Sequence, residues 1–397
     1  MSRIAGAVSV PLPSTRQQQP HIGINAHLLS TEAGYRRAGI HHYIYQVLRH
    51  LPAGGAAYTV YTRLMDGWEA RPDRRFVGST LPTDNRLARI LWEQAMWPRL
   101  ARRDGLTLMH SMAFATPRLA PCPVVVTIYD LSFIHQPESF PAAQRRYLMH
   151  ETAYSCRHAA RLITISRSGR DDVAAHYGVP PGRIDVVTPG VGAAYRPLPA
   201  ADVAAFRRRQ GLPDIFLLHV GTLQPRKNIL VLLEALSRLG RPEVPLVLVG
   251  GKGWFYDTIE ARVTALGLSK QVHFAGYADD DELPLWYNAA AALVFPSLYE
   301  GFGLPIVEAL ACGTPVVAAA TSSLPEAGGE VALYFDPRDP DELAGQLAAV
   351  LDDPDLRRRA RAAGPAHAAR FSWAQSGQAT AAVYARAMAQ PVVGGVR

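Results

Sequence analysis

The feature of this 397-residue sequence best suited to chemistry is a pair of glutamates, Glu300 and Glu308, on either side of Gly-Phe-Gly-Leu-Pro-Ile-Val. If one continuous helix carried both, their side chains would lie about 80° apart around its axis. The two glycines disfavour a helix at the start of the segment, however, and Pro305 fits a first helical turn. We therefore predict a loop at Glu300 and a helix around Glu308. Both carboxylates and the loop N–H groups could then bind one polar ligand, which suits a sugar beside a phosphate.

A second group of polar residues follows the predicted strand Ile215–Val220, in the order Gly221-Thr-Leu-Gln-Pro-Arg226-Lys227-Asn228. Gly221 permits a tight turn, and Asn228 is a good N-cap for the apolar helix that follows. The N-terminus of a helix attracts phosphate, and Arg226 and Lys227 would add two positive charges there. In surroundings that exclude water, these cations could stabilise a leaving diphosphate. The alternative is a solvated charged pair on an ordinary loop between a strand and a helix.

Other predicted strands also end in polar or aromatic residues. Tyr277 follows a strand and could either stack on a nucleobase or be a tyrosine of a surface turn. Asp130 follows the apolar strand Val124–Tyr129 and would either face a ligand cleft or cap the next turn. His110 ends another strand, and a functional role there is the less favoured interpretation. Asp279–Asp281 resemble a metal-binding acidic run, but they precede an amphipathic helix, so we interpret them as N-cap residues.

Two features of the first half allow more than one interpretation. Gly39 opens a predicted helix and could either let the backbone approach a diphosphate across a cleft or simply start the helix. The segment Arg86–Arg103 carries five arginines together with Trp92 and Trp97. It could be a helix on a membrane surface. We favour a surface helix packed against the domain by its tryptophans.

The charge of the chain is uneven. Residues 1–196 contain 23 Arg, no Lys and 13 acidic residues, a net charge of +10, which leaves −3 for the rest. The basic half could attract nucleotide phosphates, nucleic acid or an anionic membrane face, and dispersed surface arginine is the alternative. We expect no nucleic-acid partner. The three cysteines have no metal-binding spacing, which suits a reduced cytosol. We therefore expect a cytoplasmic protein, with or without peripheral contact at the inner face of the cell membrane.

Short apolar segments alternate with helical patterns, which is typical of α/β domains with parallel sheets. The predicted strands are Ile22–Asn25, Tyr58–Tyr61, Thr107–His110, Val124–Tyr129, Leu162–Ile165, Ile184–Val187, Ile215–Val220, Leu246–Val249, Val272–Ala275, Ala292–Phe295, Pro315–Ala319 and Ala332–Phe335. The predicted helices of the first half are Ile40–Leu51, Asn85–Met96, Ala142–His158 and Ser168–Tyr177.

This pattern predicts two doubly wound, Rossmann-like domains that face each other across a cleft. We assign residues 20–195 to the first domain and 196–371 to the second, with a linker around Thr188–Ala200. Residues 1–19 are expected to be a disordered tail, and a helix at 372–390 is expected to join the first domain. No run reaches the roughly 18 apolar residues of a membrane span. Ligands of such sheets bind at the carboxyl ends of the strands.

Taken together, these motifs resemble glycosyltransferase family 4, a group of retaining enzymes with the GT-B fold. The resemblance runs from about Ile22 to Tyr384. Its strongest element is Pro296-Ser-Leu-Tyr-Glu-Gly-Phe-Gly-Leu-Pro-Ile-Val-Glu-Ala with Ala311-Cys-Gly-Thr-Pro-Val after it, which is similar to the family's E-x7-E signature. The segment from Gly221 to Asn228 resembles the family's phosphate-binding loop. Weaker matches are Ala38-Gly-Ile, Trp92-Glu-Gln and Phe371-Ser-Trp.

The resemblance implies a role for each motif residue. Glu300 would lie beside the donor hexose, and Glu308 would bind the ribose hydroxyls. Arg226 and Lys227 would hold the diphosphate and, with Glu300, form the catalytic set. Tyr277 would border the base. The other donor-binding residues would be Gly39, Gly221, Thr222, Phe302, Gly303 and Leu304. Many family members have His-Asp where this chain has Tyr129-Asp130, and these two residues with His110 are our candidates on the acceptor or hexose side.

The implied reaction is transfer of a hexose to a hydroxyl group with retention of configuration and without a metal or cofactor. We expect GDP-mannose as the donor, because the loop from Gly221 to Asn228 is most like that of the family's mannosyltransferases, and UDP-glucose is the runner-up. The expected acceptor is a glycan or a lipid-linked acceptor in glycan or polysaccharide biosynthesis. Alternatives are a GT-B sugar phosphorylase, a sugar-nucleotide epimerase, or a non-catalytic sugar-nucleotide-binding protein. Both glutamates and the basic pair are present, which argues against a decayed site.

Overall fold

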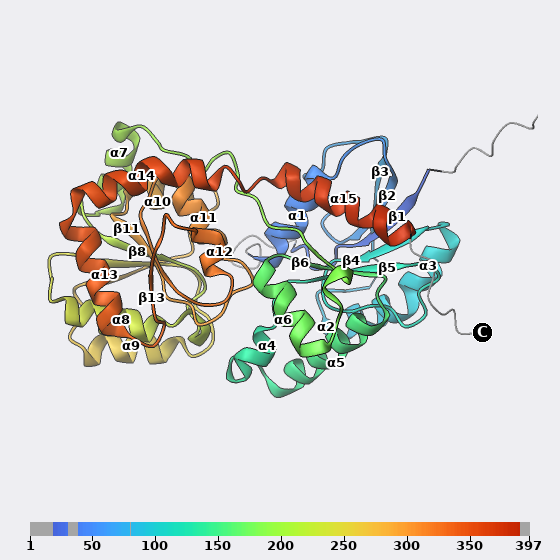
Figure 1. Ribbon diagram of the computed structural model, residues 1–397, viewed down its shortest axis with the longest axis horizontal. Coiled ribbons are helices and arrows are strands. Elements are labelled where there is room, and N and C mark those ends of the chain that lie inside the picture. The colour runs from blue at the N-terminus through green and yellow to red at the C-terminus, as the bar shows by residue number, and fades with distance from the viewer. Residues whose placement is uncertain (1–18, 31–38, 80, 390–397) are drawn as a thin grey trace, which may run out of the picture.

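The computed structural model describes residues 19–30, 39–79 and 81–389, and these form two α/β domains side by side (Figure 1). The first domain contains a seven-stranded sheet and the second a six-stranded sheet. The pairings between neighbouring strands in both sheets are parallel. The chain is therefore an α/β protein with two Rossmann-like domains, as the sequence predicts. Apart from residue 19, the expected N-terminal tail lies outside the described residues.

The first sheet has the strand order β3-β2-β1-β4-β5-β6-β7. Its strands are β1 (His21–Asn25), β2 (Ala57–Thr62), β3 (Arg74–Gly78), β4 (Leu108–Ser111), β5 (Val124–Ile128), β6 (Arg161–Thr164) and β7 (Ile184–Val186). The strand order reverses between β1 and β4, where Asn25 pairs with both Tyr61 and Ser111. A crevice for ligands opens at the carboxyl ends of the strands at such a switch point.

The second sheet has the strand order β10-β9-β8-β11-β12-β13. Its strands are β8 (Leu217–Val220), β9 (Leu246–Val249), β10 (Val272–Gly276), β11 (Ala292–Phe295), β12 (Val316–Ala319) and β13 (Leu333–Phe335). Its switch point lies between β8 and β11. The loops that leave these two strands carry the residues of the two sequence motifs, so the topology brings the motifs together.

Helices cover both faces of the two sheets. Successive residues of the central strands are therefore all buried. In the first domain they are α1 (Ile40–His50), α2 (Arg86–Leu91), α3 (Trp97–Arg103), α4 (Ser132–His135), α5 (Ala142–His158) and α6 (Arg167–Tyr177), with a π-helical turn at Trp92–Met96. In the second they are α7 (Ala200–Gln210), α8 (Ile229–Leu239), α9 (Tyr256–Ala265), α10 (Leu283–Ala289), α11 (Leu304–Ala311), α12 (Leu324–Gly328), α13 (Pro340–Asp352) and α14 (Pro354–Ala368). Short 3₁₀ turns lie at Pro137–Ser139, Pro181–Arg183 and Pro225–Lys227.

The predicted strands are present, with ends that differ by no more than two residues, but strand β3 was not predicted. Its sequence, Arg-Arg-Phe-Val-Gly, lacks an apolar run because this edge strand is partly exposed. The single helix predicted over Asn85–Met96 is instead α2 followed by the π-helical turn. Trp92 and Trp97 are buried at 2% and 0% exposure, as a helix packed by its tryptophans requires.

Two of the predicted N-caps are wrong. Asn228 stands at the N-cap position of α8 with a left-handed φ of 56°, but its side chain makes no capping hydrogen bond. Its Nδ2 instead donates to the carbonyl oxygens of Pro296 and Pro337, at 3.1 and 2.7 Å. The Asn228 side chain, which was expected to cap α8, therefore binds the carbonyl oxygens of two other loops instead. The residues Asp279–Asp281 do not cap α10 either, since Glu282 holds the N-cap position without a side-chain bond.

The last helix, α15 (Trp373–Ala389), returns from the second domain to the first, where it lies in red across the top of the first domain in Figure 1. It packs on α1 and on β4, β5 and β6. Two glycines make this contact close. A Cβ at Gly190 would lie 2.1 Å from the backbone nitrogen of Trp373, and one at Gly377 would lie 2.1 Å from the carbonyl oxygen of His50. The chain thus crosses between the domains before α7 and again before α15.

The close approach of α15 predicts that Gly377→Ala is destabilising. The added methyl would meet backbone, which cannot move aside as a side chain can, so we expect a loss of about 1–3 kcal/mol in the free energy of unfolding. The matched control is Gly345→Ala in α13, where a Cβ would have open space. Because alanine is the better helix former, this control should gain about 0.5–1 kcal/mol. Denaturant unfolding checks both, and equal effects of the two substitutions would contradict the close packing of α15.

Candidate active site

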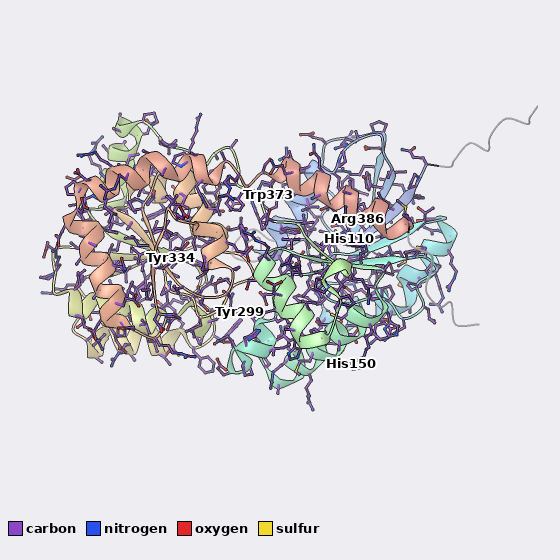
Figure 2. All side chains as sticks on the ribbon, in the orientation of Figure 1. His110, His150, Tyr299, Tyr334, Trp373 and Arg386 are labelled. Atoms are coloured by element: carbon purple, nitrogen blue, oxygen red, sulfur yellow. The ribbon has the colours of Figure 1, made fainter. Side chains whose placement is uncertain are left out.

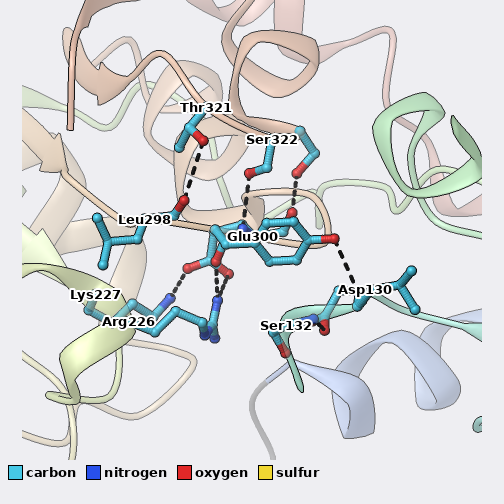
Figure 3. Close-up of polar contacts among 11 residues, drawn as sticks. Asp130, Ser132, Arg226, Lys227, Leu298, Glu300, Thr321 and Ser322 are labelled. Atoms are coloured by element: carbon cyan, nitrogen blue, oxygen red, sulfur yellow. Dashed lines mark hydrogen bonds and ion pairs between the residues drawn. The ribbon is translucent and has the colours of Figure 1, made fainter. Parts of the chain in front are cut away.

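A buried cluster of three charges lies at the switch point of the second sheet (Figure 3). The Glu300 carboxylate contacts Arg226 Nη1 through Oε2 and Lys227 Nζ through Oε1, both at 2.7 Å. The three side chains are exposed by only 16% for Arg226, 10% for Lys227 and 11% for Glu300. We call this set the ion triad. The two motifs singled out from the sequence, 73 positions apart, therefore meet in one place.

The ion triad keeps Glu300 ionised. Burial alone would raise the pKa of this carboxyl, but the adjacent Arg226 and Lys227 charges outweigh burial and lower the pKa to about 2. Burial lowers the pKa of Lys227, and the Glu300 charge acts in the opposite direction. For Arg226 the carboxylate outweighs the effect of burial and raises the pKa. One carboxylate thus contacts two cations at close range.

Backbone contacts hold the two loops of the ion triad against each other. Arg226 lies in the 3₁₀ turn after β8, and its carbonyl oxygen accepts from the N–H of Leu298 at 2.9 Å. Arg226 Nη1 also donates to the carbonyl oxygen of Tyr299 at 2.6 Å. On the other side of the loop, the Glu300 N–H donates to Ser322 Oγ at 3.0 Å. Glu300 is therefore fixed through its main chain as well as through its carboxylate.

Glycines make room for the loop that begins at Gly221. A Cβ at Gly250 would lie 2.0 Å from the carbonyl oxygen of Gly221, and one at Gly253 would lie 3.1 Å from Thr222 Cγ2. Gly221 itself has a φ of +151°, next to the side chain of Lys227. The loops after β8 and β9 therefore pack backbone to backbone, and main-chain groups line this part of the site.

The segment after Glu300 turns into α11 as the sequence predicts. Gly303 has a φ of +108° at the N-cap position, and Leu304 begins the helix without a capping side chain. The helix N-terminus therefore presents its dipole with no side-chain oxygen in the way. The side chain of Phe302 is buried at 3% exposure and lies edge-on to Phe371, with ring centroids 5.4 Å apart. Phe302 can contribute only its backbone to a ligand.

Glu308 lies apart from the ion triad in a different environment. Its carboxyl oxygen Oε2 accepts from the hydroxyl of Tyr287 at 2.8 Å, and its exposure is 8%. Burial raises the pKa of Glu308 to about 7, only partly opposed by hydrogen bonds from Tyr287 and Tyr195. Glu308 can therefore be protonated or ionised near neutral pH, whereas Glu300 is always ionised. The two glutamates of the motif are chemically distinct.

Three candidates of the first domain lie in different environments: Asp130, Tyr129 and Gly39. Asp130 is partly exposed, faces Arg226 across the domain boundary, and accepts from the N–H of Ser132 at 2.8 Å (Figure 3). It thus both caps the next turn and faces the ion triad. Tyr129 is buried, and its hydroxyl donates to the carbonyl oxygen of Met112 at 2.6 Å. Gly39 is exposed at the N-cap position of α1 with a φ of +59° and open space around its Cβ position.

His110 does not reach the site. It is 1% exposed, and its ring nitrogens lie 2.7 Å from the hydroxyl of Tyr384 and 2.9 Å from Thr127 Oγ1. Burial lowers its pKa to about 3, so the ring stays neutral. Figure 2 shows the residue inside the first domain, below α15. The structure therefore places His110 in the contact between α15 and the sheet. Tyr277, by contrast, is 40% exposed on the loop after β10.

Sequence reasoning missed a polar cluster at the switch point of the first sheet. Asn25 Nδ2 donates to Glu93 Oε1 at 3.1 Å, and His27 Nδ1 donates to Asn25 Oδ1 at 3.0 Å. Burial raises the pKa of Glu93 to about 7, and His27 Nε2 has no hydrogen-bond partner among the described residues. The ring of His27 lies edge-on to Trp92, at 4.0 Å between centroids. The signal available in the sequence was Trp92-Glu-Gln, one of the weaker motif matches. The π-helical turn that carries Trp92 and Glu93, a feature frequent at functional sites, appears only in the structure.

A buried histidine beneath the Gly221 loop was also missed. His219 has no exposed surface, and its Nδ1 donates to the carbonyl oxygen of Val294 at 3.0 Å. Its Nε2, which lacks a partner in the part of the chain that the structure describes, lies 3.6 Å from the Cβ position of Gly221. Burial and the charge of Lys227 lower the pKa of His219 to about 4. A neutral acceptor nitrogen therefore lies below the basic pair. Its only sequence signal is a polar residue inside an apolar strand.

Neither a metal site nor a membrane span is found in the described ranges. Within them, no three His, Cys, Asp or Glu side chains gather as metal ligands would. No helix there has the length and apolarity needed to cross a bilayer. Cavities of about 360 and 260 Å³ lie at the amino ends of β12 and β13 and beside the linker before α7, away from the ion triad.

Comparison with known protein families agrees with this geometry. Residues 202–367 match the family model described as "Glycosyl transferases group 1", and residues 37–195 match "Glycosyltransferase Family 4". The two matches follow each other along the chain and correspond to its two domains. The fold and the site define a protein of the GT-B class. The chain belongs to glycosyltransferase family 4.

Individual relatives extend the comparison. The chain is 36% identical over 253 residues to O-antigen chain mannosyltransferase B of Escherichia coli, an alignment that covers 63% of this chain and 66% of that protein. The chain thus spans just under two thirds of that relative's length. Among solved structures, the fold is similar to sucrose-phosphate synthase from Thermosynechococcus elongatus, with a TM-score of 0.74, 24% identity and coverage of 92% and 98% of the two chains. The fold is also similar to HepE from Anabaena, solved in complex with UDP and glucose. Here the TM-score is 0.69 and the identity 19%, with coverage of 92% of this chain and 99% of HepE.

The raised pKa of Glu308 predicts a pH-dependent stability difference for Glu308→Gln. Between its ordinary value of 4.5 and about 7, the folded protein keeps a proton that the unfolded chain releases, so this group makes the wild type less stable as pH rises. A glutamine cannot titrate and can still accept from Tyr287. From about pH 4 to about pH 8, the variant should therefore gain up to about 3 kcal/mol relative to wild type. Urea unfolding at the two pH values checks this, and a constant difference would contradict the burial of Glu308 as an acid.

Proposed function

We propose that this protein is a retaining, metal-independent hexosyltransferase that moves a sugar from a nucleotide donor to a hydroxyl acceptor. The observation that carries the proposal is the ion triad, which holds two buried cations at the switch point of the second sheet. A switch point is where doubly wound domains bind nucleotides. Paired cations in a largely dry site are what a departing diphosphate needs, because they stabilise charge that develops as the bond to the sugar breaks.

In this proposal the donor diphosphate binds to Arg226 and Lys227. Main-chain groups of the loops that begin at Gly221 and Gly303 surround it, and Thr222 lies in the first of these loops. The strong pairing of Glu300 with the same cations means that the donor must share them or displace the carboxylate. Because Glu300 is ionised at every working pH, it suits the acceptance of hydrogen bonds from sugar hydroxyls and cannot act as an acid.

The same charge distribution supports retention without an enzyme-bound intermediate. The Glu300 carboxylate is neutralised by two cations, which makes it a weak nucleophile. The leaving diphosphate oxygen is then the base that receives the proton of the acceptor hydroxyl on the same face of the sugar. Glu308 is assigned to the ribose hydroxyls and Tyr277 to the edge of the base. Tyr277 suits this role because its ring is partly exposed on a loop at the carboxyl end of β10.

We favour GDP-mannose as the donor, with UDP-glucose as the runner-up. The similarity to an O-antigen chain mannosyltransferase supports mannose and a role in glycan or polysaccharide biosynthesis. The solved structure of HepE with UDP and glucose supports the alternative, at lower identity. Either donor presents a diphosphate to the ion triad, so the choice depends on the base and sugar contacts rather than on the cations.

We assign the acceptor to the first domain. Asp130 faces the ion triad from that side, and the polar cluster of Asn25, His27 and Glu93 lies at the first sheet's switch point. A buried carboxyl with an adjacent unpartnered imidazole nitrogen is suited to hydroxyl groups of a glycan, which both donate and accept. Neither Tyr129 nor His110 presents its side chain there, so any contribution from Tyr129 is through its backbone.

The proposal places the protein in the cytoplasm with peripheral contact at the membrane. The first domain exposes Leu87, Leu91 and Leu119, at 76%, 58% and 67%. Leu87 and Leu91 lie one helical turn apart on α2, and α3 carries exposed arginines at 99, 102 and 103. Leucines that can enter a bilayer surface beside arginines that pair with anionic headgroups are typical of interfacial helices.

Glu300→Gln tests the proposed reaction. Loss of the carboxylate should lower kcat for sugar transfer about a hundredfold, because the negative charge that pairs with Arg226 and Lys227 and accepts from the sugar hydroxyls is gone. The control is Glu330→Gln at an exposed position of the same domain, which should keep wild-type kcat. Transfer is measured with GDP-mannose and UDP-glucose side by side. Faster turnover of UDP-glucose would reverse the choice of donor, and normal kcat in Glu300→Gln would remove Glu300 from the catalytic set.

A second prediction concerns the membrane. The double substitution Leu87→Asn and Leu91→Asn should lower binding to vesicles that contain anionic phosphatidylglycerol about tenfold, because the apolar contact is lost. Binding of the wild type should also weaken as salt rises. The control is Ile215→Asn, at an apolar position of the second domain that is also exposed, at 48%. Co-sedimentation measures both, and equal binding of the double variant and the wild type would contradict this surface.

A further inference from the structure

Three consecutive residues of the glutamate motif face different domains. Glu300 turns toward Arg226 and Lys227 of its own domain, whereas its neighbours Tyr299 and Gly301 contact the first domain. A Cβ at Gly301 would lie 2.4 Å from the carbonyl oxygen of Tyr129. Glycine is therefore required at position 301, because a larger residue would clash with the backbone of the first domain. Figure 2 places Tyr299 at the boundary between the two domains.

Tyr299 is bound to the first domain through both its hydroxyl and its ring. The hydroxyl donates to Asp172 Oδ2 at 2.6 Å and accepts from the N–H of Leu131 at 3.2 Å. The ring stacks on His135, with 4.7 Å between centroids. His135 Nε2 in turn lies 3.3 Å from Asp172 Oδ2, so the carboxylate joins the two rings. At 7% exposure, Tyr299 is enclosed by these contacts.

A second contact across the boundary involves helix α6, the helix of the first domain that carries Asp172. Glu326 of α12 accepts from the N–H groups of Arg167 and Ser168, at 2.9 and 2.6 Å. These N–H groups form the first turn of α6, where the helix dipole favours a negative charge. The same helix carries Asp172, the partner of Tyr299. Helix α6 is thus docked on the second domain at two points.

The Tyr299 contact reaches the ion triad through one peptide. The carbonyl oxygen of Tyr299 accepts from Arg226 Nη1 at 2.6 Å, and the next residue is Glu300. A movement of Tyr299 would therefore displace both the acceptor that orients Arg226 and the backbone that presents Glu300. Such small displacements are costly in catalysis, because reacting groups must hold their geometry closely.

We propose that Tyr299 is a positioning residue, which aligns Glu300 and Arg226 for transfer only while helix α6 of the first domain is docked on it. Domain closure then completes the ion triad as well as enclosing the donor. The inference rests on the proposed catalytic role of Glu300. In this proposal, the position of Tyr299 depends on whether the neighbouring domain is docked.

The Tyr299 hydroxyl is not the pH-sensitive group of this contact. Burial, with the nearby charges of Asp130 and Asp172, raises the pKa of Tyr299 well above its usual value, so the hydroxyl keeps its proton. The Tyr299 hydroxyl therefore remains a hydrogen-bond donor to Asp172. What breaks this hydrogen bond is separation of the domains, since donor and acceptor belong to different ones.

The experiment compares Tyr299→Phe, Asp172→Ala and the double variant in sugar transfer. Each single change removes the same charge-assisted hydrogen bond, so each should lower kcat about tenfold. The double variant should lose no more than the larger single loss, because one interaction cannot be lost twice. The affinity for GDP or UDP by calorimetry should stay within about twofold of wild type, since Arg226 and Lys227 are retained. The matched control is Tyr334→Phe, whose hydroxyl bonds to Gly329 within the second domain.

Two results would overturn the proposal. One is wild-type kcat in Tyr299→Phe, and the other is multiplied losses in the double variant, which would mean that the two residues act separately. Thermal unfolding confirms that each variant is folded. Small-angle scattering in the presence of GDP or UDP gives a readout that does not depend on activity. The radius of gyration should be larger for Tyr299→Phe and Asp172→Ala than for wild type and Tyr334→Phe, and equal radii would contradict the docking.

This design separates the inference from the proposed function. If wild-type protein transfers no sugar from either donor, the proposed function fails, and the scattering comparison alone decides whether Tyr299 holds the domains together. If wild type is active and Glu300→Gln is inactive, but Tyr299→Phe is fully active, then the proposed function stands and the positioning role is excluded.

Discussion

Burial of two cations around one carboxylate is the constraint on which the rest of this structure depends. Removing charges from water is costly unless they are paired and hydrogen-bonded, so Arg226, Lys227 and Glu300 must be held at close range by the surrounding fold. The parallel sheet does this by placing β8 beside β11, so that the loop after each strand opens at the same edge. Asp130 of the first domain faces the same two cations, so charges from both domains meet at this point.

The other features of the second domain follow from the need to bring backbone close to that charge. Gly250 and Gly253 let the loops after β8 and β9 pack without side chains between them. Gly303 provides the positive φ from which α11 begins, uncapped, beside the ion triad. Under the proposed function, main-chain N–H groups would bind the diphosphate without adding net charge or flexible side chains, and so would complement the two cations. Glu308 lies deeper in the same helix, is more easily protonated, and contributes polarity rather than fixed charge.

The first domain contributes by contact and by position. Helix α6 receives Tyr299 and Glu326 from the second domain, while the switch point between β1 and β4 presents a separate polar cluster. The chain crosses between the domains twice, before α7 and before α15. Under the proposed function, the donor would bind to the second domain, and contacts with the first domain would hold its groups in position.

The sequence alone determined the alternating strands and helices, the two-domain α/β fold, and the two motifs, because apolar periodicity, glycine spacing and adjacent charges are local properties. It did not reveal β3, whose half-exposed edge lacks an apolar run, nor that Asn228 gives its amide to distant carbonyls instead of capping α8. Only the tertiary structure decided that Glu300 pairs with Arg226 and Lys227 and that His110 turns inward to Tyr384. The same holds for the contact of Tyr299 with Asp172. Each of these depends on which strands become neighbours and how two domains meet, and such long-range contacts leave no periodic trace in the residues that make them.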